Sequence, residues 1–268
     1  MSEEHVGNAV DLRSKCTHFR VLVIGRANAG KTTLLKKLCN SIEDPEIFDE
    51  GGKKCVIFPE LIIASPAIQR GIHDIDKQLV FKSNQRFIFH DSEGFESGSK
   101  DEANKVQTFI ADRAAAHSLS AQLHVIWYCL PTDNHRPLLN FDHTFFDTDL
   151  AGKVPVIAVF TKFDGLITQA FLELKGQGVP RIQALEARHR RAEQKLETDF
   201  IKHLEAKKYP PSGYVRLDGE SSIFCMSPES TDLIESTAAA LTDETLRLLF
   251  VSVQRNNIDL CIKYAMKQ

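Results

Sequence analysis

Residues 25–33, with the sequence GRANAGKTT, constrain the fold more than any other part of the chain. They follow an apolar run at 21–24 and precede residues 34–38, whose apolar side chains have helical spacing. Glycines at both ends of such a loop let backbone N–H groups point inward, and the helix N-terminus adds a positive dipole. The stretch therefore predicts a phosphate-binding loop between a strand and a helix.

Lys31 and Thr32 carry the chemistry of this loop. A lysine at this position neutralises the outer phosphates, so Lys31 is also a candidate catalytic residue, and the Thr32 hydroxyl is placed to bind Mg²⁺. The other nucleotide contacts predicted in the loop are Asn28, Ala29, Gly30 and Thr33.

The chain alternates strand and helix patterns over most of its length. Nearly continuous apolar runs at 123–130 and 154–160 are typical of strands buried on both faces. Residues 77–82 and 86–90 flank a turn-forming Ser-Asn-Gln and predict a hairpin. We therefore expect one α/β domain spanning residues 1–268, with a mostly parallel sheet, one antiparallel strand and helices on both faces.

Two helices are expected in the C-terminal half. Residues 180–208 predict a long, charged helix with one narrow apolar stripe, which would be either docked on the sheet or a partner-binding helix. The stripe comprises Ile182, Leu185, Ala192, Leu196, Phe200 and Leu204. An additional C-terminal helix fits residues 242–267, with Thr242 as its N-cap and the domain core at 18–240. Residues 41–70 are expected to be irregular.

The composition argues against several classes of protein. A net charge of −3 and a pI near 6.4 argue against a nucleic-acid-binding domain, which is usually strongly basic. The six cysteines are scattered, without a C-x-x-C pair, and indicate reduced thiols rather than a disulfide framework or a zinc site. No apolar run approaches the ~20 residues that span a membrane, so we expect a cytoplasmic protein.

A second candidate site follows the hairpin. Asp91 comes directly after the apolar strand at 86–90 and precedes Gly94 by three residues. A carboxylate there can hold Mg²⁺, directly or through water, opposite Thr32, and the Gly94 N–H can contact the γ-phosphate during catalysis. Because ligands sit at the carboxyl ends of parallel strands, Asp91 is expected to converge with the phosphate loop.

The tetrapeptide Thr161-Lys162-Phe163-Asp164 follows the buried run at 154–160 and indicates guanine. An ionised carboxylate only accepts hydrogen bonds, and guanine offers it a pair of donors, N1–H and the exocyclic amine, that adenine lacks. Asp164 would therefore select GTP over ATP. Lys162 would lay its aliphatic stem along the base, and Thr161 completes the predicted base-binding loop.

With these three motifs in order, the chain resembles the Ras-like, translation-factor-related GTPase superfamily across most of its length. The resemblance implies a six-stranded P-loop NTPase G-domain fold, bound GTP or GDP with Mg²⁺, and switch segments before and after Asp91. The loop at 25–31 is similar to that of Era-like and tRNA-modifying bacterial GTPases. Residues 70–75, 127–129 and 251–257 resemble a group of single-domain fungal GTPases.

Two positions depart from the superfamily pattern. Phe95 stands where Ras-like enzymes carry a glutamine, and its phenyl ring cannot hydrogen-bond the attacking water. Candidate substitutes are Glu93, Glu96 and His73. The expected switch threonine is also absent, since Ser65 is the only hydroxyl between positions 41 and 83. Either Ser65 binds Mg²⁺, or the backbone and His73 do so, or this contact is missing.

Asn28 has two interpretations. In potassium-activated relatives, an asparagine at the matching position helps to hold K⁺ between the β- and γ-phosphates, where a cation neutralises charge developing in the transition state. The alternative is that Asn28 only tolerates a left-handed turn. Faster GTP turnover in KCl than in NaCl would separate the two.

The loop that closes over the base has two candidate positions. If residues 214–217 form the last strand, Asp218 and Gly219 lie over the base; if residues 223–226 do, Ser227 contacts it. We favour the first arrangement.

Three functions remain. The leading one is a guanine-nucleotide-binding protein that slowly hydrolyses GTP with Mg²⁺ and acts as a molecular switch, through a protein effector or a nucleotide-dependent dimer. The second is a GTP-binding interaction module with negligible hydrolysis, which Phe95 and the missing threonine favour. The third is an ATPase in which Asp164 is merely structural.

Overall fold

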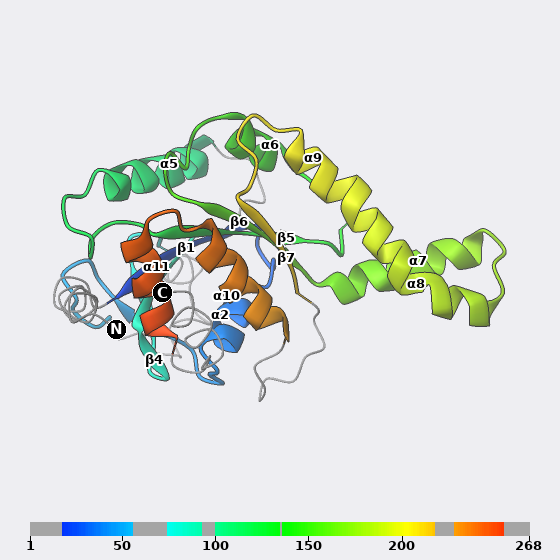
Figure 1. Ribbon diagram of the computed structural model, residues 1–268, viewed down its shortest axis with the longest axis horizontal. Helices are drawn as coiled ribbons and strands as arrows, with labels where there is room; N and C mark the ends of the chain where they lie inside the picture. Colours follow the sequence, from blue (N-terminus) through cyan, green and yellow to red (C-terminus); the bar gives the residue numbers. More distant parts are fainter. Residues whose placement is uncertain (1–17, 56–73, 93–99, 135, 218–227, 255–268) are drawn as a thin grey trace, which may run out of the picture.

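The computed structural model in Figure 1 describes residues 18–55, 74–92, 100–134, 136–217 and 228–254. In this part of the chain, seven strands form one mixed, mostly parallel sheet in the order β2-β3-β4-β1-β5-β6-β7. They are β1 (Phe19–Gly25), β2 (Glu46–Phe48), β3 (Gln78–Phe81), β4 (Asn84–Asp91), β5 (Val125–Pro131), β6 (Val156–Thr161) and β7 (Gly213–Arg216). From β4 to β7 all neighbours are parallel, and β3 is the strand antiparallel to its neighbours.

Helices cover both faces of the sheet, as expected for an α/β fold (Figure 1). One face packs against α2 (Lys31–Leu38), α10 (Pro228–Ala240) and α11 (Glu244–Val253). The other packs against α5 (Lys100–Ala114), α6 (Asn140–Asp147), the start of α7 (Phe163–Gly176) and the end of α8 (Arg181–Leu196). Because both faces are covered, every residue of β1, β5 and β6 is buried, which explains their continuous apolar runs.

The expectation of six strands was wrong, because β2 adds a seventh. This strand lies within the segment expected to be irregular and pairs antiparallel with β3 at the edge of the sheet. Its three residues are too few to display an alternating pattern. A bridge between Phe48 and Lys54, with the Cys55 N–H donating to Ile47 O at 2.8 Å, covers its other side.

The C-terminal helix is shorter than expected. It begins one residue later, with Asp243 rather than Thr242 as its N-cap, and the Asp243 side chain accepts from the Leu246 N–H at 3.0 Å. It ends at Val253, whose carbonyl accepts from Asn84 Nδ2 of β4 at 3.1 Å. The rest of the expected range, 255–267, lies outside the described residues.

The long helix of residues 180–208 is present, but only four of the six residues of its apolar stripe are buried. The helix continues from α8 through a π-helical turn (Glu197–Ile201) into α9 (Lys202–Glu205). The buried residues of the stripe are Ala192, Leu196, Phe200 and Leu204. At the other end, Ile182 is 72 % exposed and Leu185 39 % exposed. Figure 1 explains the difference: α7 and α8 extend away from the sheet as a helical hairpin, called the arm below.

No helix in the described ranges is long and apolar enough to cross a membrane. In the same ranges Cys39, Cys55 and Cys129 are free thiols. Burial raises the pKa of Cys39 and of Cys129 to about 12, so both stay protonated at neutral pH.

Two buried histidines pack around Arg20 of β1. Arg20 Nη1 donates to His90 Nε2 at 2.7 Å, and His90 Nδ1 donates to Ile75 O at 2.7 Å. The Arg20 N–H donates to His124 Nδ1 at 2.9 Å, and His124 Nε2 donates to Leu119 O at 2.8 Å. Each ring accepts one bond and donates one, which only a neutral imidazole can do. Desolvation by burial, together with Arg20, lowers the pKa of His90 to about 3 and that of His124 to about 4.

We expect the free energy of unfolding to fall as the pH drops below about 6.5. In the unfolded chain His90 and His124 bind a proton near pH 6.5, whereas in the folded chain they bind it only near pH 3 and 4. The unfolded state therefore carries more protons in this window, and each histidine costs up to about 1.4 kcal/mol per pH unit. Above pH 6.5 neither histidine contributes to the pH dependence of the free energy of unfolding. Urea unfolding between pH 8 and pH 4.5 measures the slope.

The double variant His90→Gln/His124→Asn is the control, because each amide oxygen replaces the ring nitrogen that accepts from Arg20. Its free energy of unfolding should depend less on pH, whatever its stability at pH 8. A slope equal to that of the unmodified protein would contradict the assignment.

Candidate functional site

The predicted phosphate loop connects β1 to α2 at the carboxyl edge of the sheet. Asn28 and Gly30 have left-handed backbones, with φ of 59° and 78°. A Cβ on Gly25 would lie 2.7 Å from the carbonyl oxygen of Cys129, so only glycine fits where β1 passes β5 at this point. The two glycines are therefore needed for different reasons, close strand packing at Gly25 and a turn at Gly30.

Lys31 lies over the loop to which it belongs. Its side chain is buried, and Nζ donates to Gly25 O at 3.0 Å and to Arg26 O at 3.2 Å. Nζ also lies 3.7 Å from Asp91 Oδ1, so the ammonium joins the loop to the end of β4. Thr32 and Thr33 are exposed in the first turn of α2. The hydroxyl assigned to Mg²⁺ is therefore open to a ligand.

Asp91 is the last residue of β4 and lies beside β1. It pairs with Val23 in parallel register, and the next residue, Ser92, donates its N–H to Val23 O at 3.1 Å. Asp91 is buried and close to Lys31, so the structure brings these two predicted residues together as expected. Gly94 and Ser65, the other residues predicted here, lie outside the described residues.

The predicted base-binding loop contacts the phosphate loop directly. Thr161 ends β6, and its hydroxyl donates to Ala29 O at 2.8 Å inside the protein. Thr132, at the end of β5, donates its hydroxyl to the carbonyls of Thr161 and Lys162, both at 3.1 Å. These bonds join the ends of β5 and β6 to the phosphate loop in one polar network.

Lys162 and Asp164 begin α7. Lys162 is its N-cap, with a left-handed φ of 58°, and Asp164 lies half-buried in the first turn. An acidic residue in the first turn is favourable next to the helix N-terminus. The helix therefore holds Asp164 at the edge of the sheet that carries Lys31 and Asp91.

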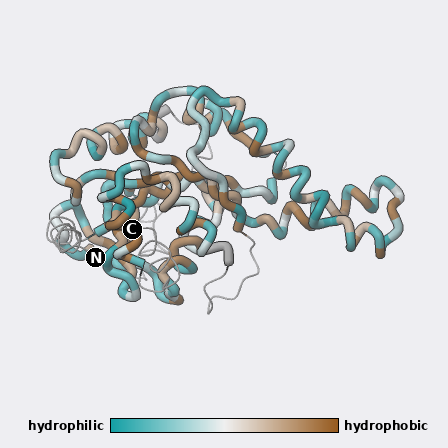
Figure 2. The backbone as a smooth tube through the Cα atoms, viewed as in Figure 1, coloured by the Kyte–Doolittle hydropathy of each residue, from teal (hydrophilic) through white to brown (hydrophobic). Residues whose placement is uncertain are grey.

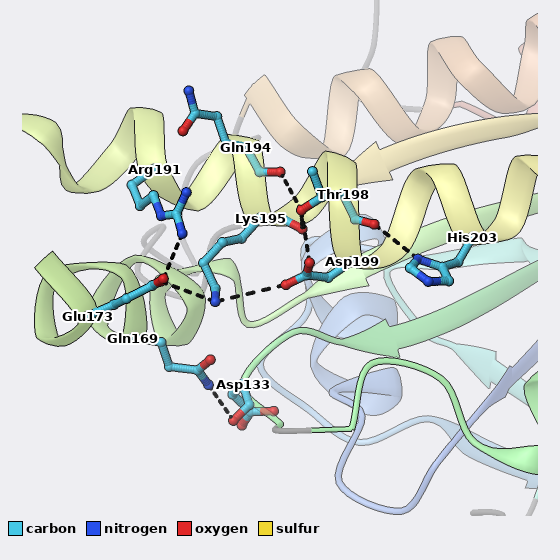
Figure 3. Close-up of polar contacts among 9 residues, drawn as sticks. All are labelled: Asp133, Gln169, Glu173, Arg191, Gln194, Lys195, Thr198, Asp199 and His203. Carbon is cyan, nitrogen blue, oxygen red and sulfur yellow. Dashed lines mark hydrogen bonds and ion pairs between the residues drawn. The ribbon is translucent and has the colours of Figure 1, made fainter. Parts of the chain in front are cut away.

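Asp133, which sequence reasoning missed, organises this loop. Its Oδ2 lies 2.9 Å from Lys162 Nζ, and its carbonyl accepts from Gln169 Nε2 of α7 at 2.9 Å (Figure 3). A Cβ on Gly165 would lie 2.7 Å from the Asp133 Cβ, so glycine is needed where α7 passes Asp133. Asp133 lies two residues after the end of the buried strand β5, and this position was a usable signal, similar to the one that identified Asp91 and Asp164.

A buried network anchors the phosphate loop from the other side. Arg26 donates to Asp142 Oδ2 of α6 at 2.8 Å, and Tyr128 donates its hydroxyl to Asp142 Oδ1 at 2.7 Å. Asp142 also accepts from the Leu139 N–H at 2.6 Å, and Arg26 reaches the carbonyl of Pro137 at 2.8 Å. Burial and the nearby Asp142 carboxylate raise the pKa of Tyr128, which remains a neutral donor.

A strand is present where residues 214–217 were expected to form one: β7 (Gly213–Arg216) pairs in parallel with β6. The Leu217 N–H donates to Phe160 O at 2.7 Å, and Leu217 O accepts from Phe163 N–H at 3.3 Å. The chain therefore runs from β7 past the first residue of α7, next to Asp164. Asp218 and Gly219, predicted to close over the base, lie outside the described residues, as does the alternative strand at 223–226.

No protein-family model matches this chain, and no curated protein matches its sequence.

Proposed function

We propose that the protein binds guanine nucleotides with Mg²⁺ and slowly hydrolyses GTP to GDP and phosphate, acting as a molecular switch. The observation that carries the proposal is the 2.8 Å hydrogen bond from Thr161 Oγ1 to Ala29 O. A loop suited to phosphates and a loop suited to guanine are thus held in direct contact at one edge of the sheet. One nucleotide spanning both loops accounts for this arrangement.

The described residues fit a Mg²⁺-bound nucleotide. Among them there is no group of three or more His, Cys, Asp or Glu side chains that could hold a metal ion on their own. A hard cation that takes one protein hydroxyl, a carboxylate and phosphate oxygens suits Thr32 and Asp91 better than an all-protein cage. Bound there, Mg²⁺ would neutralise negative charge on the phosphates.

Lys31 has a defined part in this proposal. In the structure its ammonium is satisfied by two loop carbonyls and by Asp91. Phosphate oxygens bind a lysine more strongly than neutral carbonyls do, because both partners then carry charge. Lys31 therefore binds the outer phosphates over the loop and, with the Gly94 N–H, stabilises charge that develops there.

Selectivity for guanine rests on Asp164, and the supporting loop explains how that carboxylate is held. Thr132 and Asp133 fix the backbone and side chain of Lys162, and α7 carries Asp164 from that point. A loop that is already held in place loses less entropy when it binds the two guanine donors.

Asn28 and Phe95 determine how fast GTP is hydrolysed. The left-handed φ of Asn28 agrees with the backbone interpretation, and its exposed side chain is also compatible with holding K⁺. Since Phe95 cannot position water, a K⁺ ion is the proposed source of transition-state charge neutralisation. The state of the nucleotide would be read by a protein effector or through a nucleotide-dependent dimer.

The purified protein should bind labelled GTP and GDP in the presence of Mg²⁺, and unlabelled ATP should not displace them. Single-turnover hydrolysis should be several-fold faster in KCl than in NaCl if Asn28 holds K⁺, and equal in both salts if it does not. Binding without turnover would favour the interaction module over the GTPase. Displacement by ATP as effective as by GTP would contradict the role of Asp164.

A further inference from the structure

The arm carries solvent-exposed apolar side chains at its far end. Leu172 of α7 is 61 % exposed, and Ile182 and Leu185 of α8 are 72 % and 39 % exposed. Ile182 and Leu185 are three residues apart and therefore neighbours on one face of α8. They belong to the same apolar stripe whose later residues are buried against the domain. At the far end of the arm no part of the sheet lies opposite them, so they are exposed (Figures 1 and 2).

The same end of the arm is basic, although the protein as a whole is acidic. The distal arm, defined as residues 172–191, contains five basic and two acidic residues, an excess of three positive charges. The whole chain has a net charge of −3, so the remainder carries −6. The basic residues are Lys175, Arg181, Arg188, Arg190 and Arg191, and the acidic ones are Glu173 and Glu186.

The internal ion pairs of the arm do not remove this asymmetry. Glu173 is held between the helices by Arg191 at 2.6 Å and Lys195 at 3.3 Å (Figure 3). Lys175, Arg181 and Arg190 are exposed, and Glu186 is the one other acidic residue of the distal arm. The outer surface of the distal arm therefore combines aliphatic and positively charged side chains.

We propose that the distal arm docks on an anionic phospholipid bilayer. A bilayer offers negative headgroups and hydrocarbon at the same surface, which matches arginines beside Ile182 and Leu185. Because the arm projects from the domain, its far end reaches a flat surface before the sheet does (Figure 1). The rest of the chain, with its net charge of −6, is repelled by that surface, so the charge distribution also orients the molecule. This proposal is independent of the nucleotide site.

Two other occupants fit the distal arm less well. A second copy of the chain would bring two ends with the same positive charge together, which is unfavourable. Residues 172–191 contain no Trp, Tyr or Phe, and their exposed apolar side chains are Leu and Ile. Protein interfaces obtain most of their affinity from Trp, Tyr and Arg; the distal arm has Arg but no aromatic anchor, and its exposed aliphatic side chains are suited to hydrocarbon.

Vesicle flotation with the full chain tests the proposal. The protein should float with vesicles of 70 % phosphatidylcholine and 30 % phosphatidylserine, but not with pure phosphatidylcholine, and less so as NaCl is raised. Arg181→Glu/Arg190→Glu should weaken binding by at least about 25-fold, since each basic residue near an anionic surface contributes about fivefold. Ile182→Ser/Leu185→Ser should also weaken it.

Lys153→Glu/Lys202→Glu is the matched control, since both lysines are exposed outside the distal arm and the charge change is the same. Its binding should stay within about twofold of the unmodified protein. Ile42→Ser, at an exposed isoleucine elsewhere, is the control for the apolar pair. Equal losses in the two charge variants, or no binding that depends on phosphatidylserine, would overturn the proposal. Soluble polyglutamate that binds as tightly as the vesicles, with Ile182→Ser/Leu185→Ser unaffected, would identify an acidic-protein site instead.

Discussion

Asp164→Asn is expected to lower the affinity for GTP by about 100-fold or more. The carboxylate accepts two hydrogen bonds from guanine in the proposed complex, and each bond to a charged group contributes about 1.5–3 kcal/mol. An asparagine side chain keeps one acceptor but turns an N–H₂ group towards a base that offers only donors at that edge. One hydrogen bond is then lost and an unfavourable contact between donors is formed. Titration with fluorescent GTP measures the change.

The same variant should bind xanthosine triphosphate better than GTP. Xanthine has a carbonyl at the position of the exocyclic amine of guanine, and the side-chain amide introduced by the substitution can donate to it. Asp112→Asn, at an exposed position of α5, is the control and should leave both affinities unchanged. GTP affinity that survives in Asp164→Asn, without a gain for xanthosine triphosphate, would show that Asp164 does not contact the base.

Asp142→Ala is expected to cause the largest loss of stability, about 3–5 kcal/mol in the free energy of unfolding. Asp142 accepts from Arg26, from Tyr128 and from the Leu139 N–H, and Arg26 and Tyr128 are buried. Removing the carboxylate leaves a buried guanidinium without its counter-ion, which costs more than the attraction between the pair was worth. The total free energy of unfolding of a small domain is only about 5–15 kcal/mol. The midpoint of urea unfolding should therefore move to a much lower urea concentration.

Tyr128→Phe separates the hydrogen bond from the charge. It removes one donor to Asp142 while the ion pair with Arg26 remains, so we expect a loss of only about 1–2 kcal/mol. Asp112→Ala, at a surface position, should change stability by less than about 0.5 kcal/mol. If Asp142→Ala lowers the free energy of unfolding no more than Tyr128→Phe does, the ion pair with Arg26 is not what stabilises this region.

The arrangement of the candidate site could be predicted because it depends on topology. Once β1, β4 and β6 were recognised as parallel strands, the residues at their carboxyl ends had to share one edge, and Lys31 and Asp91 do. Asp133 obeys the same rule but belongs to no tetrapeptide that marks it. The structural role of Asp133 follows only from its contacts with Lys162 and Gln169, which are 29 and 36 residues away in the sequence.

The arm could not be predicted, because a hydrophobic pattern does not encode how far a sheet extends. Ile182 and Leu185 follow the same helical spacing as Leu196 and Phe200, so one stripe appears continuous in the sequence. Whether a stretch of it is buried depends on what lies opposite, here the sheet for residues near 200 and solvent near 182. The strand β2 was missed for another reason, since three residues carry no measurable period.

The helix α7 connects the predicted base-binding loop to the far end of the arm. Its first turn carries Asp164 and is clamped to Asp133 through Lys162 and Gln169. Its 14 residues extend for about 21 Å, so a tilt of about 10° at the root displaces the far end by roughly 4 Å. The 2.6 Å contact between Glu173 and Arg191 makes α8 move with it. Any tilt of α7 at the Asp164 end would therefore be enlarged where the arm ends.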